Sequence, residues 1–365
     1  MPTLVSLLPS DLARARGGAE RYAVALHEAL TRELPSWRTR ALVVATRERE
    51  RHVPEGWTAV GGPGARFLSV GDAMGAPTVL RHTLRDADVV VCHQWRTRAA
   101  TTLRLVRPVR RRTAFVVIDH GAGTRLGYAL SWLPLAGATL GAHQSEFEAG
   151  ISPIKADRHV TVRGGVDERR FTPDGTTPDR DFLMVGRFEP YKGQLRFLEQ
   201  LPEGARAELI GPSDNNDAAY VASVRALAHE RGVPIRHDVS DLELVAAYRG
   251  ARHTVQVPVD LRRYGGAAPP ELLGLTMLEA MACGSVPICP GTGASAEFVA
   301  DGATGRTYDA DSESGLSAVL QDALTDTDGH AALRAGAIAE SGRWTWGAAA
   351  RALLAALPDA EQGRS

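Results

Sequence analysis

The chain alternates short apolar runs with segments whose apolar residues recur at helical spacing. The apolar runs lie at 3–9, 40–46, 87–95, 113–123, 205–212 and 254–260. Helical spacing follows the first of them, at Tyr22, Leu26 and Leu30. Continuous apolar strands that end in polar residues are typical of parallel sheets buried on both faces. The pattern therefore predicts an α/β fold whose functional residues gather at the carboxyl ends of its strands.

The strongest local pattern is a helix with one apolar face, predicted over 275–283 after Gly274. Glu279 falls inside this helix, and Glu271 lies in the loop before it. The free N–H groups at 272–275 and the positive end of the helix dipole favour an anion such as a diphosphate. We therefore expect an anion site flanked by two carboxylates.

A second candidate anion site lies where the strand after residue 181 ends. Gly186 and Arg187 follow the strand, and a short loop leads to Lys192 and the next helix. A guanidinium and an ammonium on either side of such a turn can converge on one anion. Lys155 and Lys192 are the two lysines of a chain that otherwise uses arginine, which hints that a compact ammonium is needed at residue 192.

The first half offers a glycine pair and two histidines. Gly17 and Gly18 separate a strand from a helix, a geometry that binds anions but also occurs in ordinary turns. Two further strands end near His93 and near Asp119 and His120. A histidine at a strand end is often structural, so both a site role and a packing role stay open for His93.

Composition narrows the function classes. A net charge of −1 over 365 residues gives no support for a nucleic-acid partner. The three cysteines lack metal-ligand spacing and favour a reduced, cytoplasmic setting. The first ten residues read as a strand rather than a signal peptide, and no apolar run approaches the ~20 residues that span a bilayer. A peripheral membrane contact stays open.

Several motifs resemble one enzyme family. The segment E-L-L-G-L-T-M-L-E-A-M-A-C-G from Glu271 is similar to the E-x7-E signature of retaining GT-B glycosyltransferases, in particular family 4, glycosyl transferases group 1. The segments G-G-A-E-R at 17–21 and G-R-F-E-P-Y-K-G at 186–193 also match family motifs. The chain departs from the family pattern at Leu273, where phenylalanine is usual, and at 291–297, where the family has a tighter glycine pair.

The resemblance implies a GT-B fold, in which two Rossmann-like doubly wound domains face each other across a cleft. The expected acceptor domain spans 1–172 together with a returning helix at 343–365. The expected donor domain spans 173–342. The long loop at 260–270, rich in glycine and proline, is expected to cover the donor sugar.

The implied reaction is retaining transfer of a sugar from a nucleotide-diphosphate donor to a hydroxyl or amine, with no metal and no other cofactor. Neither the base nor the sugar can be read from the sequence, and the acceptor is a small molecule, a glycan or a lipid-linked compound. The implied catalytic residues are His120, Arg187, Lys192 and Glu271. The implied donor contacts are Gly186, Arg187, Lys192, Pro212, Val239, Glu271, Leu273, Gly274, Leu275, Thr276 and Glu279, and the implied acceptor-side residues are Gly17, Gly18, His93, Asp119 and His120.

Two other functions remain open at this point. G-T-G-A-S-A at 291–296 spells a dinucleotide-binding pattern, G-x-G-x-x-A, which would suit an NAD(P)-dependent oxidoreductase. It lies far into the second half, whereas such patterns normally follow the first strand of their domain. A catalytically degenerate protein that only binds a sugar nucleotide is the third reading.

Overall fold

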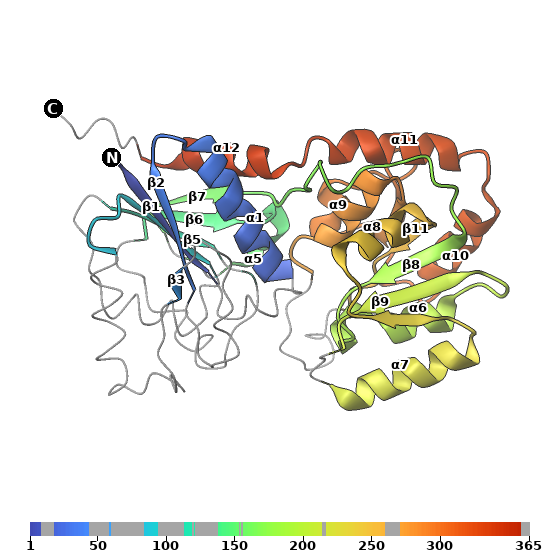
Figure 1. Cartoon of the computed structure of the whole chain (residues 1–365). Helices are drawn as coiled ribbons and strands as arrows, with labels where there is room; N and C mark the ends of the chain where they lie inside the picture. The colour runs from blue at the N-terminus through green and yellow to red at the C-terminus, as the bar shows by residue number, and fades with distance from the viewer. Residues whose placement is uncertain are drawn as a thin grey trace. The chain divides into compact units, whose positions relative to one another are not determined.

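The chain divides into two compact units in the computed structural model (Figure 1). Unit 1 comprises residues 1–164 and 346–365, and unit 2 comprises 165–345. The structure describes residues 1–8, 18–43, 58–59, 84–93, 113–118, 120, 138–152, 154, 156–213, 217–259 and 271–358. The sequence predicts a boundary after residue 172, whereas this division falls after residue 164. Val166 pairs with Thr345, and Phe171 packs against Tyr248, so both belong to the core of unit 2.

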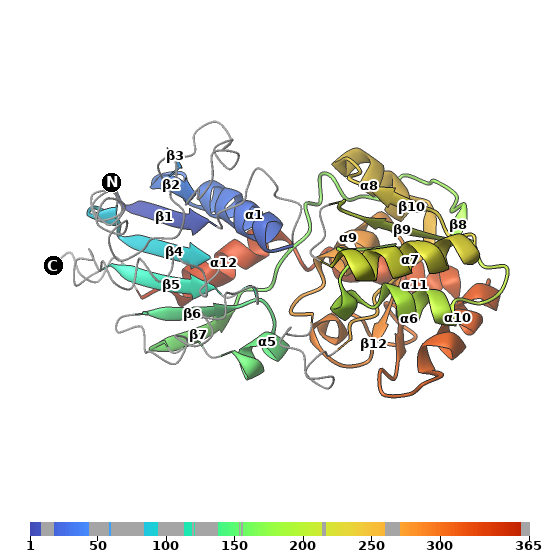
Figure 2. The ribbon, with the colours of Figure 1, turned by 90° about the horizontal axis from the view of Figure 1, so that it is seen from below.

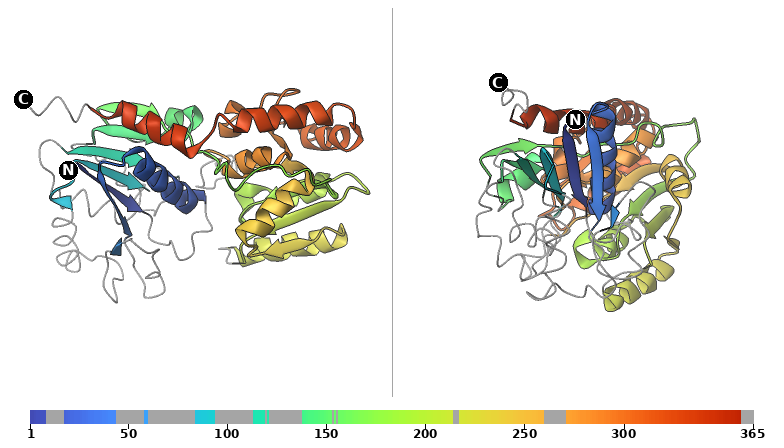
Figure 3. Two further views of the ribbon diagram at one scale, coloured as in Figure 1. Left: turned by 45° about the horizontal axis from the view of Figure 1, so that its top comes forward. Right: turned by 60° about the vertical axis from the view of Figure 1, so that its left-hand side comes forward.

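Unit 1 contains one parallel sheet, with strand order β3-β2-β1-β4-β5-β6-β7 in the part of the chain that is described. Its strands are β1 Thr3–Leu8, β2 Arg38–Val43, β3 Thr58–Ala59, β4 Val89–His93, β5 Ala114–Ile118, β6 Leu140–His143 and β7 Arg158–Thr161. Its described helices are α1 Gly18–Glu33, α5 Glu146–Ile151 and α12 Trp346–Ala356. Helix α12 packs beside α1 (Figure 3), so the end of the chain returns to this unit, starting at Trp346 rather than at residue 343.

Unit 2 contains a second parallel sheet, with strand order β10-β9-β8-β11-β12-β13. Its strands are β8 Arg180–Val185, β9 Ala207–Gly211, β10 Ile235–His237, β11 Ala251–Val255, β12 Val286–Pro290 and β13 Arg306–Tyr308. Its helices are η4 Pro190–Lys192, α6 Gln194–Gln200, α7 Ala218–Glu230, α8 Asp241–Arg249, α9 Leu275–Cys283, η6 Ala294–Glu297, α10 Gly315–Thr325 and α11 His330–Ser341.

Helices cover both faces of the unit 2 sheet. Phe197 of α6, Val224 of α7 and Leu320 of α10 share one buried apolar cluster with strand residues. Leu244 of α8 and Ala280 of α9 belong to another. Figure 2 shows α6, α7 and α10 together on one side of the sheet. This is the doubly wound arrangement expected from the sequence, because strands with two buried faces need helices on both.

One helix of unit 2 is very short. The turn at 291–293 leads into η6, a 3-10 helix of four residues, rather than into a full α-helix. Gly293 lies at a φ of 88°, and Phe298, just after η6, is buried against Trp344. The chain therefore turns into the core after one tight turn.

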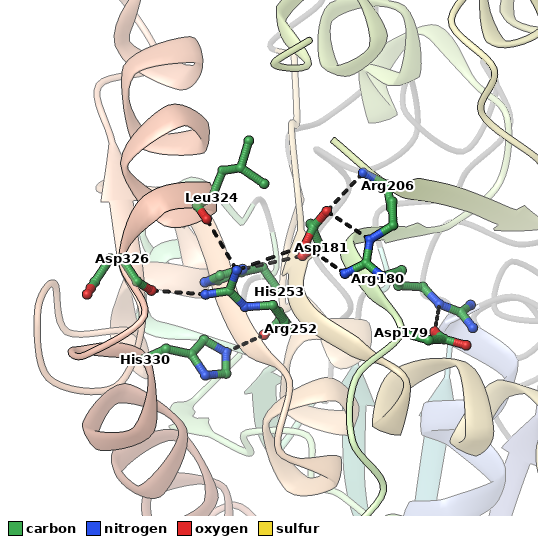
Figure 4. A network of polar contacts seen from close by, with 9 residues as sticks. All are labelled: Asp179, Arg180, Asp181, Arg206, Arg252, His253, Leu324, Asp326 and His330. Carbon is green, nitrogen blue, oxygen red and sulfur yellow. Dashed lines mark hydrogen bonds and ion pairs between the residues drawn. The ribbon is translucent and has the colours of Figure 1, made fainter. Parts of the chain in front are cut away.

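The amino-terminal edge of the unit 2 sheet is held by a polar network (Figure 4). The Asp181 carboxylate accepts hydrogen bonds from the backbone N–H and the guanidinium of Arg206. The Arg252 guanidinium donates to the carbonyls of Leu324 and Asp326, where α10 ends. These bonds join the first residues of β8 and β11 to the neighbouring segments, at the edge opposite the one where ligands bind in such folds.

His253 is the buried imidazole of this network, with Nδ1 3.3 Å from the Asp181 carbonyl oxygen. Burial, together with the charges of His330 and Arg252, lowers the pKa of His253 to about 3. The folded chain therefore keeps this imidazole neutral at pH values where the unfolded chain protonates it.

We expect acid to destabilise unit 2 in part through His253. Because the unfolded imidazole titrates near pH 6.5 and the folded one near 3, stability is lost as the pH falls below about 6.5, by up to about 1.4 kcal/mol per pH unit. His253→Asn should flatten the pH dependence of urea unfolding by that amount between pH 6 and 5. The same substitution at the exposed His229 should leave the slope unchanged, and equal slopes in wild type and His253→Asn would contradict the assignment.

Candidate active site

The candidate site lies at the carboxyl edge of the unit 2 sheet, where the strand order reverses. Strand β8 pairs with β9 on one side and with β11 on the other, both in parallel. The chain therefore leaves β8 toward one side of the sheet and leaves β11 toward the other. In doubly wound sheets, ligands bind in the crevice outside such a switch point.

The loop after β8 fits tightly against the segment that follows β11. Gly193 has a φ of 76°, and a Cβ there would lie 2.0 Å from the Val257 carbonyl oxygen. A side chain at Gly211 would meet the Gly186 carbonyl oxygen at 2.3 Å. Both positions require glycine for space, and Gly193 also requires it for its backbone angle. Gly193, the last residue of the predicted G-R-x-x-x-x-K-G motif, thus lets the loop after β8 lie against the segment after β11.

Lys192 meets Glu271 at this edge. The Lys192 ammonium and the Glu271 carboxylate form an ion pair between side chains that are 22% and 19% exposed. Burial by itself lowers the pKa of Lys192, but Glu271 and Tyr191 outweigh it and the pKa is raised. Arg187 acts on Lys192 in the opposite direction, which places the two cations within electrostatic range. Lys192 is therefore a fixed positive charge at neutral pH.

Helix α9 begins at the same edge, on a buried polar support. Its N-cap Gly274 has a φ of 83°, and a Cβ there would lie 2.7 Å from the Ser295 hydroxyl. Ser295 donates a 2.5 Å hydrogen bond to the Gln256 side-chain carbonyl, and both residues are buried. The preceding Leu273 is buried as well. This packing fixes where the first N–H groups of α9, at Leu275 and the following Thr276, enter the site.

Glu279 lies inside α9, as the sequence predicts, and is separated from Glu271 by its partners. Its side chain is buried and accepts a 3.2 Å hydrogen bond from the Tyr248 hydroxyl of α8. Glu271 instead pairs with Lys192 in the loop. The two carboxylates of the E-x7-E motif therefore have distinct surroundings.

The loops after β9 and β10 are joined to each other. Asp238 has a φ of 54°, the one positive φ of a non-glycine residue in the described chain. Its carboxylate accepts hydrogen bonds from the backbone N–H and hydroxyl of Ser213. This clamp holds Pro212 and Val239, two of the predicted donor contacts, in adjacent loops at the same edge.

Unit 1 brings two of its predicted residues together at its own carboxyl edge. His93 Nδ1 lies 3.1 Å from His120 Nε2, and the rings are stacked at 5.4 Å with an interplanar angle of 5°. The Tyr22 ring packs edge-on against His120. Gly18 opens α1, whereas Gly17 and Asp119 lie outside the described residues.

His93 and His120 are both kept neutral. Burial lowers the pKa of His120 to about 4, against the opposing effect of a side-chain interaction with Gln144. Burial also lowers the pKa of His93, and the nearby His120 and His27 lower it further. Two neutral imidazoles in contact can share one hydrogen bond, with one nitrogen donating and the other accepting.

The described residues offer no arrangement suited to metal or thiol chemistry. Within the described part of the chain, no three His, Cys, Asp or Glu residues cluster as metal ligands. The chain has four Asp-x-Asp triplets, at 86–88, 179–181, 309–311 and 326–328, and each has a carboxylate with a structural partner. Asp88 accepts from the Thr3 N–H, Asp181 from Arg206 and Asp309 from the Asp311 N–H, and Asp326 pairs with Arg306. Burial raises the pKa of the Cys283 and Cys289 thiols to about 12.

The structure also weakens the oxidoreductase alternative. The segment 291–296 follows β12, which lies away from the switch point between β8 and β11. It leads into the short η6, whereas a dinucleotide fingerprint needs a helix N-terminus aimed at the pyrophosphate.

Several residues that shape the site escape the sequence reasoning. Tyr191 and Gln194 contact Arg187 within the loop after β8 and its helix, whereas Tyr248 and Gln256 bond to residues of distant segments. Tyr191 carried a local signal, because it lies within the motif next to Lys192. The loop at 260–270 lies outside the described residues.

Comparison with known proteins agrees with this geometry. Residues 167–340 match the family model described as "Glycosyl transferases group 1". The chain is 27% identical to a GDP-mannose-dependent alpha-(1-6)-phosphatidylinositol monomannoside mannosyltransferase of Mycolicibacterium smegmatis, over 98% of this chain and 99% of that protein. It is 31% identical to a D-inositol 3-phosphate glycosyltransferase of Xylanimonas cellulosilytica, over 57% of this chain and 53% of that protein.

Solved structures share the fold of both units. Anabaena HepE, crystallised with UDP and glucose, matches with a TM-score of 0.77 and 18% identity over 98% of this chain and 100% of that chain. Sucrose-phosphate synthase from Thermosynechococcus elongatus matches with a TM-score of 0.76 and 18% identity over the same shares. Residues 167–340 therefore match the glycosyl transferases group 1 family, and the two units have the fold of these solved structures.

Proposed function

We propose that the chain transfers a sugar from a nucleotide-diphosphate donor to an acceptor hydroxyl or amine, with retention at the anomeric carbon and without a metal ion. One observation carries the proposal. Arg187 and Lys192 come from the loop after β8, and Glu271 and the start of α9 come from a second segment, yet all belong to the switch-point edge of one parallel sheet.

The leaving diphosphate is the group that this edge suits best. Negative charge builds up on the leaving group as the glycosidic bond breaks, and stabilising it can be the largest catalytic contribution. Arg187 and Lys192 supply full positive charges, and the first N–H groups of α9 supply oriented donors. These groups can take over the role that a divalent cation has in other transferases.

The other donor contacts follow from position. Glu271, in the loop beside Lys192, is placed to accept hydrogen bonds from the sugar hydroxyls. Glu279, buried in α9 with Tyr248 on one oxygen, is assigned to the ribose hydroxyls. Pro212 and Val239, in the clamped loops after β9 and β10, are assigned to the base.

Retention is proposed on the family resemblance, by departure and attack on the same face of the sugar. The chemistry then needs a group that orients the sugar or the acceptor rather than a carboxylate nucleophile. We assign this to His120, whose neutral ring is held against His93.

In the described residues, no helix is long and apolar enough to cross a membrane.

The relatives suggest which substrates to test first. One is named for GDP-mannose and a phosphatidylinositol mannoside, and others for D-inositol 3-phosphate. HepE was solved with UDP-glucose. We therefore propose GDP-mannose and UDP-glucose as the first donors and inositol-bearing compounds, free or lipid-linked, as the first acceptors. A cytoplasmic location with peripheral membrane contact would suit a lipid-linked acceptor.

Arg187→Ala and Lys192→Ala should each lower kcat by about 10²-fold, because each removes a charge that stabilises the leaving group. The measurement is kcat and KM with whichever of the two donors is turned over. Arg343→Ala, at a side chain that is 77% exposed and pairs with Glu340, should be close to wild type. A change in KM alone would mean ground-state binding, and wild-type kinetics would refute the cation pair.

Activity should persist in excess EDTA, because backbone N–H groups and two cations carry the charge of the diphosphate. The assay compares initial rates before and after extensive dialysis against the chelator. Complete loss of activity that Mg²⁺ or Mn²⁺ restores would overturn the metal-free mechanism.

The two glutamates should affect different steps. Glu279→Gln should weaken the binding of free nucleoside diphosphate about tenfold or more, because an amide accepts fewer hydrogen bonds from ribose than a carboxylate does. Glu271→Gln should not weaken that binding, because free nucleoside diphosphate lacks the sugar, but it should lower kcat. Titration calorimetry with GDP and UDP measures both variants.

The 2′,3′-dideoxy analogues provide the matched probe for this assignment. If Glu279 holds the ribose, wild type and Glu279→Gln should bind the dideoxy nucleotide with similar affinity. A difference that persists with the dideoxy nucleotide would place Glu279 away from the ribose. Equal weakening by both substitutions would show that the carboxylates are not divided between the two sugars.

A further inference from the structure

The Tyr191 side chain lies between the two cations of the donor site and has no role in the reaction as described so far. We propose that Tyr191 is a positioning residue that holds the Arg187 guanidinium with its hydroxyl and the Lys192 ammonium with its ring. The inference rests on the proposed function, since it assumes that both cations act on the leaving diphosphate.

The backbone of Tyr191 is fixed before its side chain is considered. Its carbonyl oxygen accepts a 2.8 Å hydrogen bond from Val259 N–H, which belongs to the segment after β11. The turn of η4 is closed by hydrogen bonds from Lys192 N–H to the Glu189 carbonyl and from Gly193 N–H to the Pro190 carbonyl. The main chain therefore sets the direction of the Tyr191 side chain, and substitutions at this position should leave the loop in place.

The hydroxyl of Tyr191 contacts the Arg187 side chain directly. Arg187 is exposed, and its Nη2 donates a 2.9 Å hydrogen bond to Tyr191 Oη. Gln194 Nε2 donates a 2.8 Å hydrogen bond to the Arg187 carbonyl oxygen, and the fully buried Gln194 accepts a hydrogen bond from the Tyr220 hydroxyl. A long exposed side chain loses considerable rotamer entropy when it binds an anion, and a prior hydrogen bond reduces that loss.

The ring of Tyr191 holds the second cation. Lys192 Nζ lies 5.1 Å from the ring centroid, within the range of a cation–π contact. Glu271 also attracts this ammonium, but a carboxylate carries a full negative charge that would oppose an incoming diphosphate. An aromatic face attracts the ammonium without that charge. The ring can therefore keep Lys192 in place while the ammonium binds a phosphate.

Two substitutions separate the contributions of the hydroxyl and the ring. Tyr191→Phe removes the hydroxyl alone and should lower kcat about tenfold, the magnitude expected for one hydrogen bond to a charged group. Tyr191→Leu also removes the aromatic face and should lower kcat by a further factor of about three to ten. The affinity for GDP and UDP should change about threefold or less, because positioning matters most when charge develops.

The experiment measures release of GDP from GDP-mannose and of UDP from UDP-glucose without acceptor, so that no acceptor need be known. In the Arg187→Ala background, Tyr191→Phe should have no further effect on kcat, because the hydroxyl then has no cation to hold. In the Lys192→Ala background, Tyr191→Phe and Tyr191→Leu should behave alike. A purely structural role for Tyr191 would instead lower the melting temperature and add to both cation variants.

The outcomes separate the inference from the function on which it rests. If Arg187→Ala and Lys192→Ala lower kcat but Tyr191→Phe matches wild type, the positioning role is wrong and the proposed function stands. If the double variants show additive losses, Tyr191 does not act through the cations. If neither donor is turned over and neither GDP nor UDP binds, the proposed function fails, and the inference fails with it.

Discussion

The pairing of β8 with β11 is the constraint on which the candidate site depends. The register sets Phe182 opposite His253 and Leu183 opposite Thr254, so the two strands end at the same edge. Since they leave the sheet toward opposite sides, the loops that follow them can close on one ligand from two directions. The polar network around Asp181 and Arg252 secures the other end of the same two strands. The paired strands therefore hold the loops of the site in fixed positions.

Close contact between the loops follows from that pairing. Gly193 lies against Val257, and Tyr191 bonds to Val259, so the loop after β8 is held to the chain leaving β11. Lys192 and Glu271 then form an ion pair although 79 positions separate them in the sequence. A side chain at residue 193 would push these loops apart. The positions of the charged side chains thus depend on an uncharged contact between backbone segments.

Features that depend on local sequence pattern could be predicted from the sequence. The strands, helix α9, the glycine positions and the charged residues follow from hydrophobic spacing and from motifs, as Arg187, Lys192, Glu271 and Glu279 illustrate. Family resemblance supplied the two-unit fold. Contacts between distant segments could not be predicted in the same way, because nothing in the sequence links Tyr248 to Glu279 until α8 and α9 are packed together. The positive φ of Asp238 likewise depends on its bond to Ser213.

The support beneath α9 constrains how the chain can vary. Gln256, Gly274 and Ser295 come from three separate segments and meet in a space that admits no further atom without displacement. A larger residue at any one of them would displace the N-terminus of α9, and a smaller one would leave a buried polar group without its partner. Each position is therefore conditional on the other two. In the divergence of related chains, substitutions at these three positions should occur together, as one coevolving unit.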